Sequence, residues 1–161
     1  MTPKEKEDYI RKLTRKEDVE RTVISQNWKL ASFVIGFSIA ILAFGIQLLM
    51  SMRDVLVFEQ MLILLISFIL LVIAFISGMG RLYYSHKELN ICYQYNADLL
   101  KPENFDRENE LLEEVNEMRK KPGWKSSVCS YVMSISFVGG IFAYTLFLFT
   151  YLLKQLCYSV Y

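Results

Sequence analysis

Residues 30–52 read LASFVIGFSIAILAFGIQLLMSM and contain no Asp, Glu, Lys, Arg or His. Two more stretches share this property, residues 60–80 and residues 126–153. A run of about 20 apolar residues, each rising about 1.5 Å in a helix, matches the roughly 30 Å hydrocarbon thickness of a bilayer. Three such runs exclude a soluble single domain. The sequence therefore predicts an all-α membrane protein, with three transmembrane helices and a cytoplasmic helical layer.

The 161 residues include 18 Lys and Arg and 17 Asp and Glu, all of them outside the three apolar runs. Lys and Arg cluster in residues 1–29 and 81–125, with eight in each, whereas residues 53–59 and 154–161 hold one each. Positive residues that flank membrane spans favour the cytoplasmic side. We therefore expect a multi-pass protein of the cell inner membrane, with its N-terminus in the cytoplasm and its C-terminus outside.

The apolar runs and the charge pattern divide the chain into segments. These are a cytoplasmic N-terminal helix (1–28), a transmembrane hairpin (29–80, with spans 29–51 and 57–80), a cytoplasmic helical hairpin (81–125), a third transmembrane helix (126–154) and an external tail (155–161). No Gly or Pro separates the N-terminal segment from the first span, so residues 4–51 are expected to form one nearly continuous helix. The span at 57–80 is dominated by Leu, Ile and Phe and is expected to face lipid.

Two prolines, Pro102 and Pro122, are expected to interrupt the helices of the cytoplasmic hairpin. Pro102 is expected to end the helix that follows the second span, because proline cannot donate the next helical hydrogen bond. An amphipathic helix is then expected at 103–121, with its acidic residues first and its basic residues last. Pro122 and Gly123 are expected to stop this helix and turn the chain back to the membrane.

The first span carries a stripe of small and polar residues at helical spacing. At about 100° per residue, steps of three and four residues keep them on one face. Within the span the stripe consists of Ser32, Gly36, Ala40, Ala43, Gln47 and Ser51. One interpretation is close helix packing, since small residues let backbones approach each other in lipid. The other is a pore lining, in which several copies of this helix surround an axis.

Small residues also occur on the opposite face of the first span. They are Ala31, Ser38 and Gly45. One face of the helix can therefore pack within the chain while the other is left for a symmetry axis.

Asp54 and Glu59 lie in and after the loop beyond the stripe and would form an outer mouth that favours cations. The other interpretation of these two carboxylates is ordinary contact with lipid headgroups. The third span has small residues of its own, which predict a helix-packing patch. That patch consists of Ser136, Gly139, Gly140 and Ala143.

No catalytic constellation is evident in the sequence. The single histidine, His86, has no partners at metal-ligand spacing, and there is no Gly-rich phosphate loop, nucleophile elbow or carboxylate pair within a span. The cytoplasmic segments are nearly neutral, so their charge gives no specific nucleic-acid signal. We therefore expect no enzymatic activity, no metal and no cofactor.

Three features carry a resemblance to a known family. They are the charged helix before Trp28, the tight hairpin around Arg53 and Asp54, and the long helix after the second span. That long helix carries Arg81, Tyr83, Tyr84, Leu89, Asn90, Tyr93 and Leu99. In this architecture, over about residues 5–120, the chain resembles the SLATT-type small membrane effectors of bacterial anti-phage defence. The resemblance implies a membrane pore that arrests infected cells when a partner senses infection, and the third span is an addition to that family's two-helix pattern.

The sequence-based hypothesis is a homo-oligomeric channel or pore-forming effector in the lipid bilayer, gated through its cytoplasmic helices by a sensor protein or signal ligand. The cytoplasmic layer is too thin to bury its apolar stripes alone, which favours oligomerisation. The alternative is a non-conducting membrane interaction protein. This would be an accessory subunit of a larger membrane complex or a bacteriocin immunity protein, a class to which the chain is also similar in its small size and charged cytoplasmic part.

Overall fold

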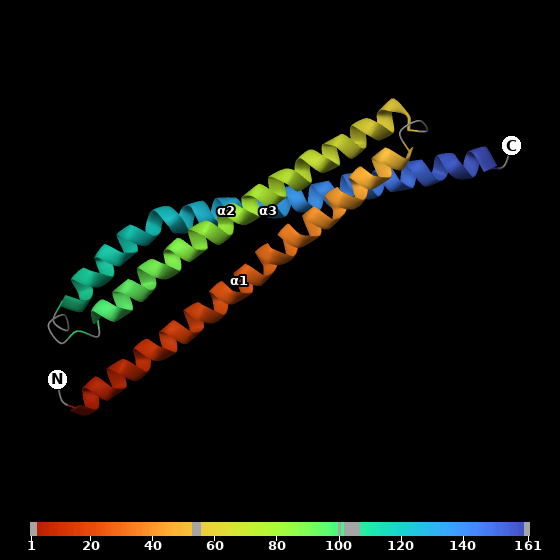
Figure 1. Ribbon diagram of the computed structural model, residues 1–161. Coiled ribbons are helices and arrows are strands. Elements are labelled where there is room, and N and C mark those ends of the chain that lie inside the picture. The colour runs from red at the N-terminus through yellow and green to blue at the C-terminus, as the bar shows by residue number, and fades with distance from the viewer. Residues whose placement is uncertain (1–2, 53–55, 100, 102–106, 160–161) are drawn as a thin grey trace. The chain divides into compact units, whose positions relative to one another are not determined.

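Three long helices make up the structure (Figure 1). The computed structural model describes residues 3–52, 56–99, 101 and 107–159. These residues form α1 (Pro3–Met52), α2 (Phe58–Leu99) and α3 (Glu108–Ser159), and none of them lies in a strand. Each helix contains a stretch long and apolar enough to cross a membrane. The chain is therefore an all-α membrane protein with three transmembrane helices, as the sequence predicts.

α1 runs without interruption from the charged N-terminal segment into the first span, which confirms the continuous helix expected over residues 4–51. α2 also continues past its apolar run and ends at Leu99, consistent with a helix that cannot extend through Pro102. Pro102 itself, and residues 103–106 of the expected amphipathic helix, lie outside the described residues.

α3 does not stop at Pro122, so the break expected there is wrong. Proline removes one backbone donor and costs roughly 3 kcal/mol in a helix interior. Contacts with α2 on both sides of the proline recover part of this cost. Arg119 Nη2 donates to Glu88 Oε1 at 3.1 Å, and Lys125 Nζ lies 5.3 Å from the centroid of the Tyr84 ring. Tertiary contacts therefore keep α3 helical where the local sequence rule predicts a turn.

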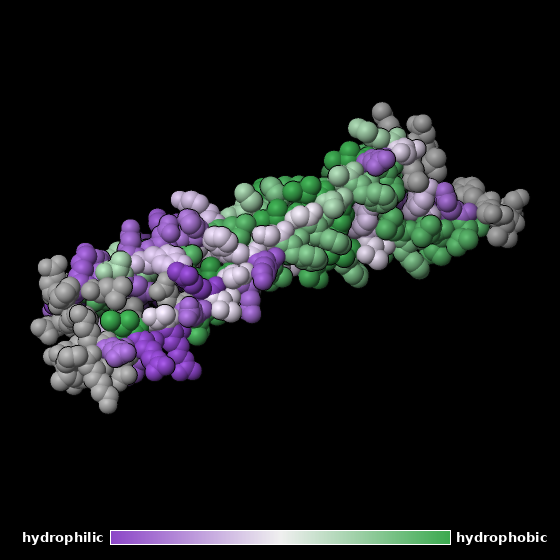
Figure 2. All heavy atoms as spheres, turned by 60° about the horizontal axis from the view of Figure 1, so that its bottom comes forward, coloured by the Kyte–Doolittle hydropathy of each residue, from purple (hydrophilic) through white to green (hydrophobic). Residues whose placement is uncertain are grey.

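Contacts along the helices divide the chain into two compact units. The membrane unit contains Ser32–Met79 and Cys129–Tyr161, and the polar unit contains Met1–Ala31 and Gly80–Val128. Apolar side chains cover the visible face of the membrane unit, whereas hydrophilic side chains gather over the polar unit (Figure 2). This division follows the alternation of charge-free and charged segments in the sequence.

In the membrane unit, α2 packs against both of the other helices. Ser67 Oγ on α2 donates to the carbonyl oxygen of Gly140 on α3 at 2.9 Å. A Cβ on Gly45 of α1 would lie only 2.5 Å from the Phe68 ring of α2, so glycine permits this approach. The buried cluster at the centre of this packing consists of Leu64, Tyr144 and Phe147. Small residues and one hydrogen bond thus hold the three spans together.

The expectation that the second span faces lipid holds for only one side of α2, where large apolar side chains are exposed, while the other side is buried. α2 buries Leu64, Ser67, Leu71 and Ala74. In its most apolar window 28% of the residues are buried, against 17% in the corresponding window of α1. The reason is topological, because short connections pair α2 with both α1 and α3, and consecutive elements tend to pack as neighbours. α1 is therefore a span with much of its surface left open.

In the polar unit, α2 also has contacts with both neighbours. The Trp28 ring of α1 and the His86 ring of α2 are 5.9 Å apart, and the Arg21 guanidinium of α1 lies 5.3 Å from the centroid of the Tyr93 ring. A small buried cluster joins α2 to α3. It consists of Tyr95, Leu99 and Val115. Rings, cations and a few apolar side chains therefore make up the contacts of this thin layer.

Candidate functional site: the small-residue stripe of α1

All six stripe residues predicted to line a pore are exposed in the structure. They are Ser32, Gly36, Ala40, Ala43, Gln47 and Ser51. A Cβ added to Gly36 would meet no atom within 4 Å, so space beside the stripe is open. The chain therefore leaves this entire face of α1 uncovered.

The polar side chains of the stripe differ in how they are satisfied. Ser51 Oγ donates to the carbonyl oxygen of Gln47 at 2.9 Å, so this hydroxyl is paired within the helix. The Gln47 amide makes no hydrogen bond with any side chain or backbone group of the described residues. An unpaired amide is costly in hydrocarbon, because lipid tails offer it neither donors nor acceptors. The stripe thus presents a group that water or another protein chain would satisfy.

The opposite face of α1 is used for packing inside the chain. Ala31 and Ser38 are fully buried, Val34 is 4% exposed, and Gly45 lies against the Phe68 ring. α1 therefore has two faces of small residues, one of which is covered and one of which is open. Small residues on a span are enriched where helices meet, so an open small face is a second packing or lining surface.

Large apolar side chains flank the open stripe. Phe33, Phe37 and Phe44 are each more than two-fifths exposed, and they suit lipid or a neighbouring helix. Phe33 and Phe37 stack with their centroids 5.6 Å apart, and Phe37 also meets Phe137 of α3 edge-on at 6.0 Å. The stripe is therefore a narrow polar strip bordered by aromatic rings.

Only one of the two carboxylates expected at an outer mouth lies among the described residues. Asp54 lies outside the described residues, and Glu59 is exposed in the first turn of α2. A carboxylate at this position also complements the positive end of the helix dipole. The neighbouring Gln60, which the sequence analysis passed over, is 6% exposed, and its Oε1 accepts a hydrogen bond from Val57 N at 3.3 Å. Gln60 therefore helps to satisfy the start of α2.

The small-residue patch predicted on the third span lies against α2 within the chain. A Cβ on Gly140 would lie 2.9 Å from Leu71 Cγ, and one on Gly139 would lie 3.4 Å from Leu70 Cδ1. Ser136 is buried and Ala143 is half-buried. This patch is thus occupied inside one chain, unlike the stripe on α1.

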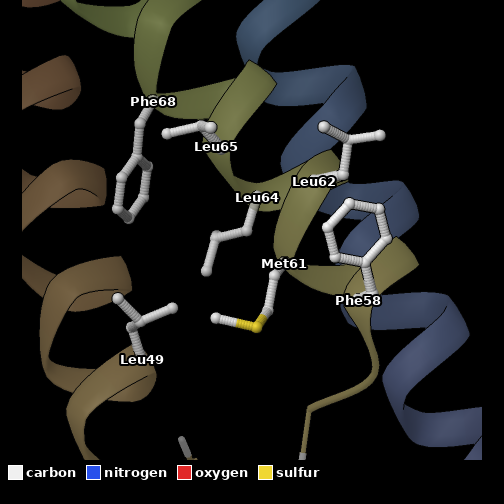
Figure 3. Close-up of a pocket in the computed structure, with 7 residues that line it drawn as sticks. All are labelled: Leu49, Phe58, Met61, Leu62, Leu64, Leu65 and Phe68. Carbon is white, nitrogen blue, oxygen red and sulfur yellow. The ribbon is translucent and has the colours of Figure 1, made fainter.

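An apolar cavity of about 260 Å³ opens between α1 and α2 in the membrane unit (Figure 3). Leu49 of α1 faces Leu64 and Phe68 of α2 across it, and all of the described residues that line it are apolar. Ligand sites usually combine apolar walls with a few placed polar groups, and this cavity lacks them. It is a gap between transmembrane helices and supplies no chemistry.

The polar unit holds a buried cation that the sequence analysis did not single out. Arg81 is only 8% exposed, and its Nη2 donates to Asn27 Oδ1 at 2.8 Å. Its Nη1 is buried and has no hydrogen-bond partner among the described residues. The sequence signal was available, because Arg81 is the first charge after the run Gln60–Gly80.

The helices and the open stripe define the class as an all-α, multi-pass membrane protein. Among the described residues, no group of three His, Cys, Asp or Glu side chains is placed to hold a metal ion. Comparison with protein-family models, with curated proteins and with solved structures gives no match to this chain. Function is therefore inferred from the geometry and chemistry of its own residues.

Proposed function

We propose that the protein forms a homo-oligomeric channel or pore-forming effector in the inner membrane, with the stripe of α1 facing the axis and the polar unit acting as gate or sensor. The N-terminus would be cytoplasmic and the C-terminus external. The SLATT-like architecture adds a role in bacterial anti-phage defence, in which a sensor protein or signal ligand would trigger opening.

The observation that carries this proposal is the contrast between the two small-residue faces of α1. The face with Ser38 and Gly45 is buried against the other spans, whereas the face with Gly36 and Gln47 is open. Lipid tails cannot hydrogen-bond the side-chain amide of Gln47, whereas water in an axis can. Repeating the chain around α1 would cover the open face.

The polar unit supplies a route for gating. Its α3 segment is fastened to α2 by Arg119 and Glu88 on one side of Pro122 and by Lys125 and Tyr84 on the other. The proline leaves one helical hydrogen bond unmade between these two contacts. A signal that breaks either contact would free α3 to bend there, and this change would reach the spans through a continuous helix.

The alternative function is a non-conducting interaction protein, such as an immunity protein or an accessory subunit. The open space beside Gly36 supports this alternative, because a single helix of a partner protein could pack closely there. The two functions differ in whether filling the stripe blocks ions or only weakens binding. Conductance therefore separates them.

The test is to record ion currents from purified protein in planar bilayers, for the wild type, Gly36→Leu and Ser134→Leu. Ser134 is an exposed small residue on the α3 span, so its change to leucine matches the added bulk away from the stripe. We expect currents from the wild type and from Ser134→Leu, and none from Gly36→Leu. Equal currents from all three proteins would refute the stripe as the channel lining, and absence of current from a wild type that is also a monodisperse monomer would refute the channel.

The same three proteins can be compared in cells. Overproduction of a pore-forming effector should slow bacterial growth, and Gly36→Leu should relieve this effect while Ser134→Leu should not. An immunity or accessory protein would be harmless in all three forms.

A further inference from the structure

The Arg81 side chain is nine-tenths buried, and its one hydrogen-bond partner among the described residues is neutral. Its Nη2 donates to the amide oxygen of Asn27 at 2.8 Å, and its Nη1 is buried without a hydrogen-bond partner among the described residues. Arginine stays charged in proteins and carries five donors. One amide oxygen cannot neutralise that charge, and a buried charge without a counter-charge is strongly unfavourable.

The sequence places no carboxylate within six residues of Arg81 on α2 or of Asn27 on α1. No Asp or Glu occurs in residues 21–53, 60–87 or 118–161. The next acidic residue along α2 is Glu88, about 10 Å further along the helix, and it already accepts two hydrogen bonds from Arg119. The counter-charge for Arg81 therefore has to come from outside the chain.

The charges around Arg81 share its sign. Lys29 follows Asn27 by two residues on α1, and Lys125 of α3 lies over the Tyr84 ring, three residues from Arg81 on α2. Both lysines are exposed and lie in the same polar unit. The region around Arg81 therefore attracts an anion.

The position of Arg81 at the end of a membrane span indicates which kind of anion it meets. Arg81 directly follows the charge-free run Gln60–Gly80, so it comes where a span leaves the hydrocarbon. Trp28, which contacts the His86 ring, is the kind of residue that lies at headgroup level. Phosphate oxygens lie at this level, and the planar fork of a guanidinium suits them as it suits carboxylates.

We propose that Arg81, positioned by Asn27, binds a phosphate group at the end of the second span. The phosphate would accept hydrogen bonds from the guanidinium once the side chains that cover Nη1 move aside, while Lys29 and Lys125 add positive potential nearby. Its source is either the headgroup of an anionic lipid or a soluble phosphate compound. The proposal does not depend on ion conduction and goes beyond it.

Thermal unfolding in dodecyl maltoside, a detergent without phosphate, tests this site. The proteins are the wild type, Arg81→Gln and Lys87→Gln, and the last is a matched control because it removes an exposed cation from the same helix. Without phosphate, Arg81→Gln should unfold at a higher temperature than the wild type, because the unpaired buried charge is gone while a donor to Asn27 remains. Added phosphatidylglycerol should raise the unfolding temperature of the wild type and of Lys87→Gln by about 3 °C or more, and that of Arg81→Gln much less.

Sodium phosphate, compared with sodium chloride at equal ionic strength, separates the two sources. If only sodium phosphate raises the unfolding temperature of the wild type, the ligand is a soluble phosphate compound. If only phosphatidylglycerol raises it, the ligand is a lipid headgroup. Either shift in unfolding temperature must be much smaller in Arg81→Gln than in the wild type to support the site. Equal shifts in the wild type and in Arg81→Gln, or no shift with either probe, would overturn it.

Native mass spectrometry gives a second measurement that needs no unfolding transition. The wild type and Lys87→Gln should retain phosphatidylglycerol at least about tenfold better than Arg81→Gln. Arg81→Lys keeps the charge without the planar fork, so it should retain the lipid to an intermediate degree and serves if Arg81→Gln fails to fold. A double variant combines Arg81→Lys with Lys87→Gln. Equal retention of phosphatidylglycerol by the two single variants and this double variant would overturn the role of the guanidinium.

Discussion

Replacement of Gly140 by alanine should destabilise the membrane unit. The new Cβ would lie 2.9 Å from Leu71 Cγ and 3.4 Å from the Leu71 backbone nitrogen. Leu71 is fully buried, so neither its branch point nor its backbone has space to move away. Overpacking of this kind typically costs about 1–3 kcal/mol, and the better helix propensity of alanine recovers at most about 1 kcal/mol.

The expected net loss for Gly140→Ala is therefore about 1–2 kcal/mol of unfolding free energy. Reversible unfolding in mixed micelles, by titration with dodecyl sulfate, measures it. Gly36→Ala is the matched control, because a Cβ there meets nothing within 4 Å, and it should leave the unfolding of the single chain unchanged or slightly improved. If Gly140→Ala were as stable as Gly36→Ala, the close packing of α3 on α2 would be refuted.

Three further changes test the contacts that position the helices. Ser67→Ala removes the hydrogen bond to the Gly140 carbonyl and should cost about 0.6 kcal/mol in the same titration, so a loss near zero would mean that the bond is not made. Glu88→Gln weakens the pair with Arg119, which is about one-third exposed, so thermal unfolding should show a loss of no more than about 1 kcal/mol that shrinks as salt is added. Pro122→Ala restores the missing helical hydrogen bond and should slow amide exchange in the preceding turn, whereas unchanged exchange would show that the proline does not weaken α3.

The three spans were predictable because their signal is long and uninterrupted. A charge-free run such as residues 30–52 has no stable alternative in water, and the absence of Gly or Pro between residues 4 and 29 makes a continuous helix the only simple outcome. Each of these predictions depends on local composition. Long-range contacts are not needed to make them.

The errors arose where contacts between helices outweigh local rules. Pro122 reads as a helix stop, but Arg119 and Lys125 fasten the helix to α2 on either side of it. The second span reads as lipid-facing because it is apolar, but its place between two connections gives it two neighbours, and Ser67 reaches Gly140. Apolar composition is the same for a buried face and a lipid-facing face, so only packing distinguishes them.

The candidate site was predictable in part. Helical periodicity alone put the six stripe residues on one face, and the structure leaves all of them exposed while it buries the opposite face. Periodicity cannot show what covers the open face of α1, because that depends on how separate chains associate. Arg81 was missed because a single arginine after a span usually extends to the headgroups, and only the structure places it against Asn27.

The mass of the particle in lipid nanodiscs is the most direct test of the central claim, that α1 faces a symmetry axis. A discrete assembly of about four copies or more is the predicted result. A monodisperse monomer, or a one-to-one complex with another protein, would contradict it.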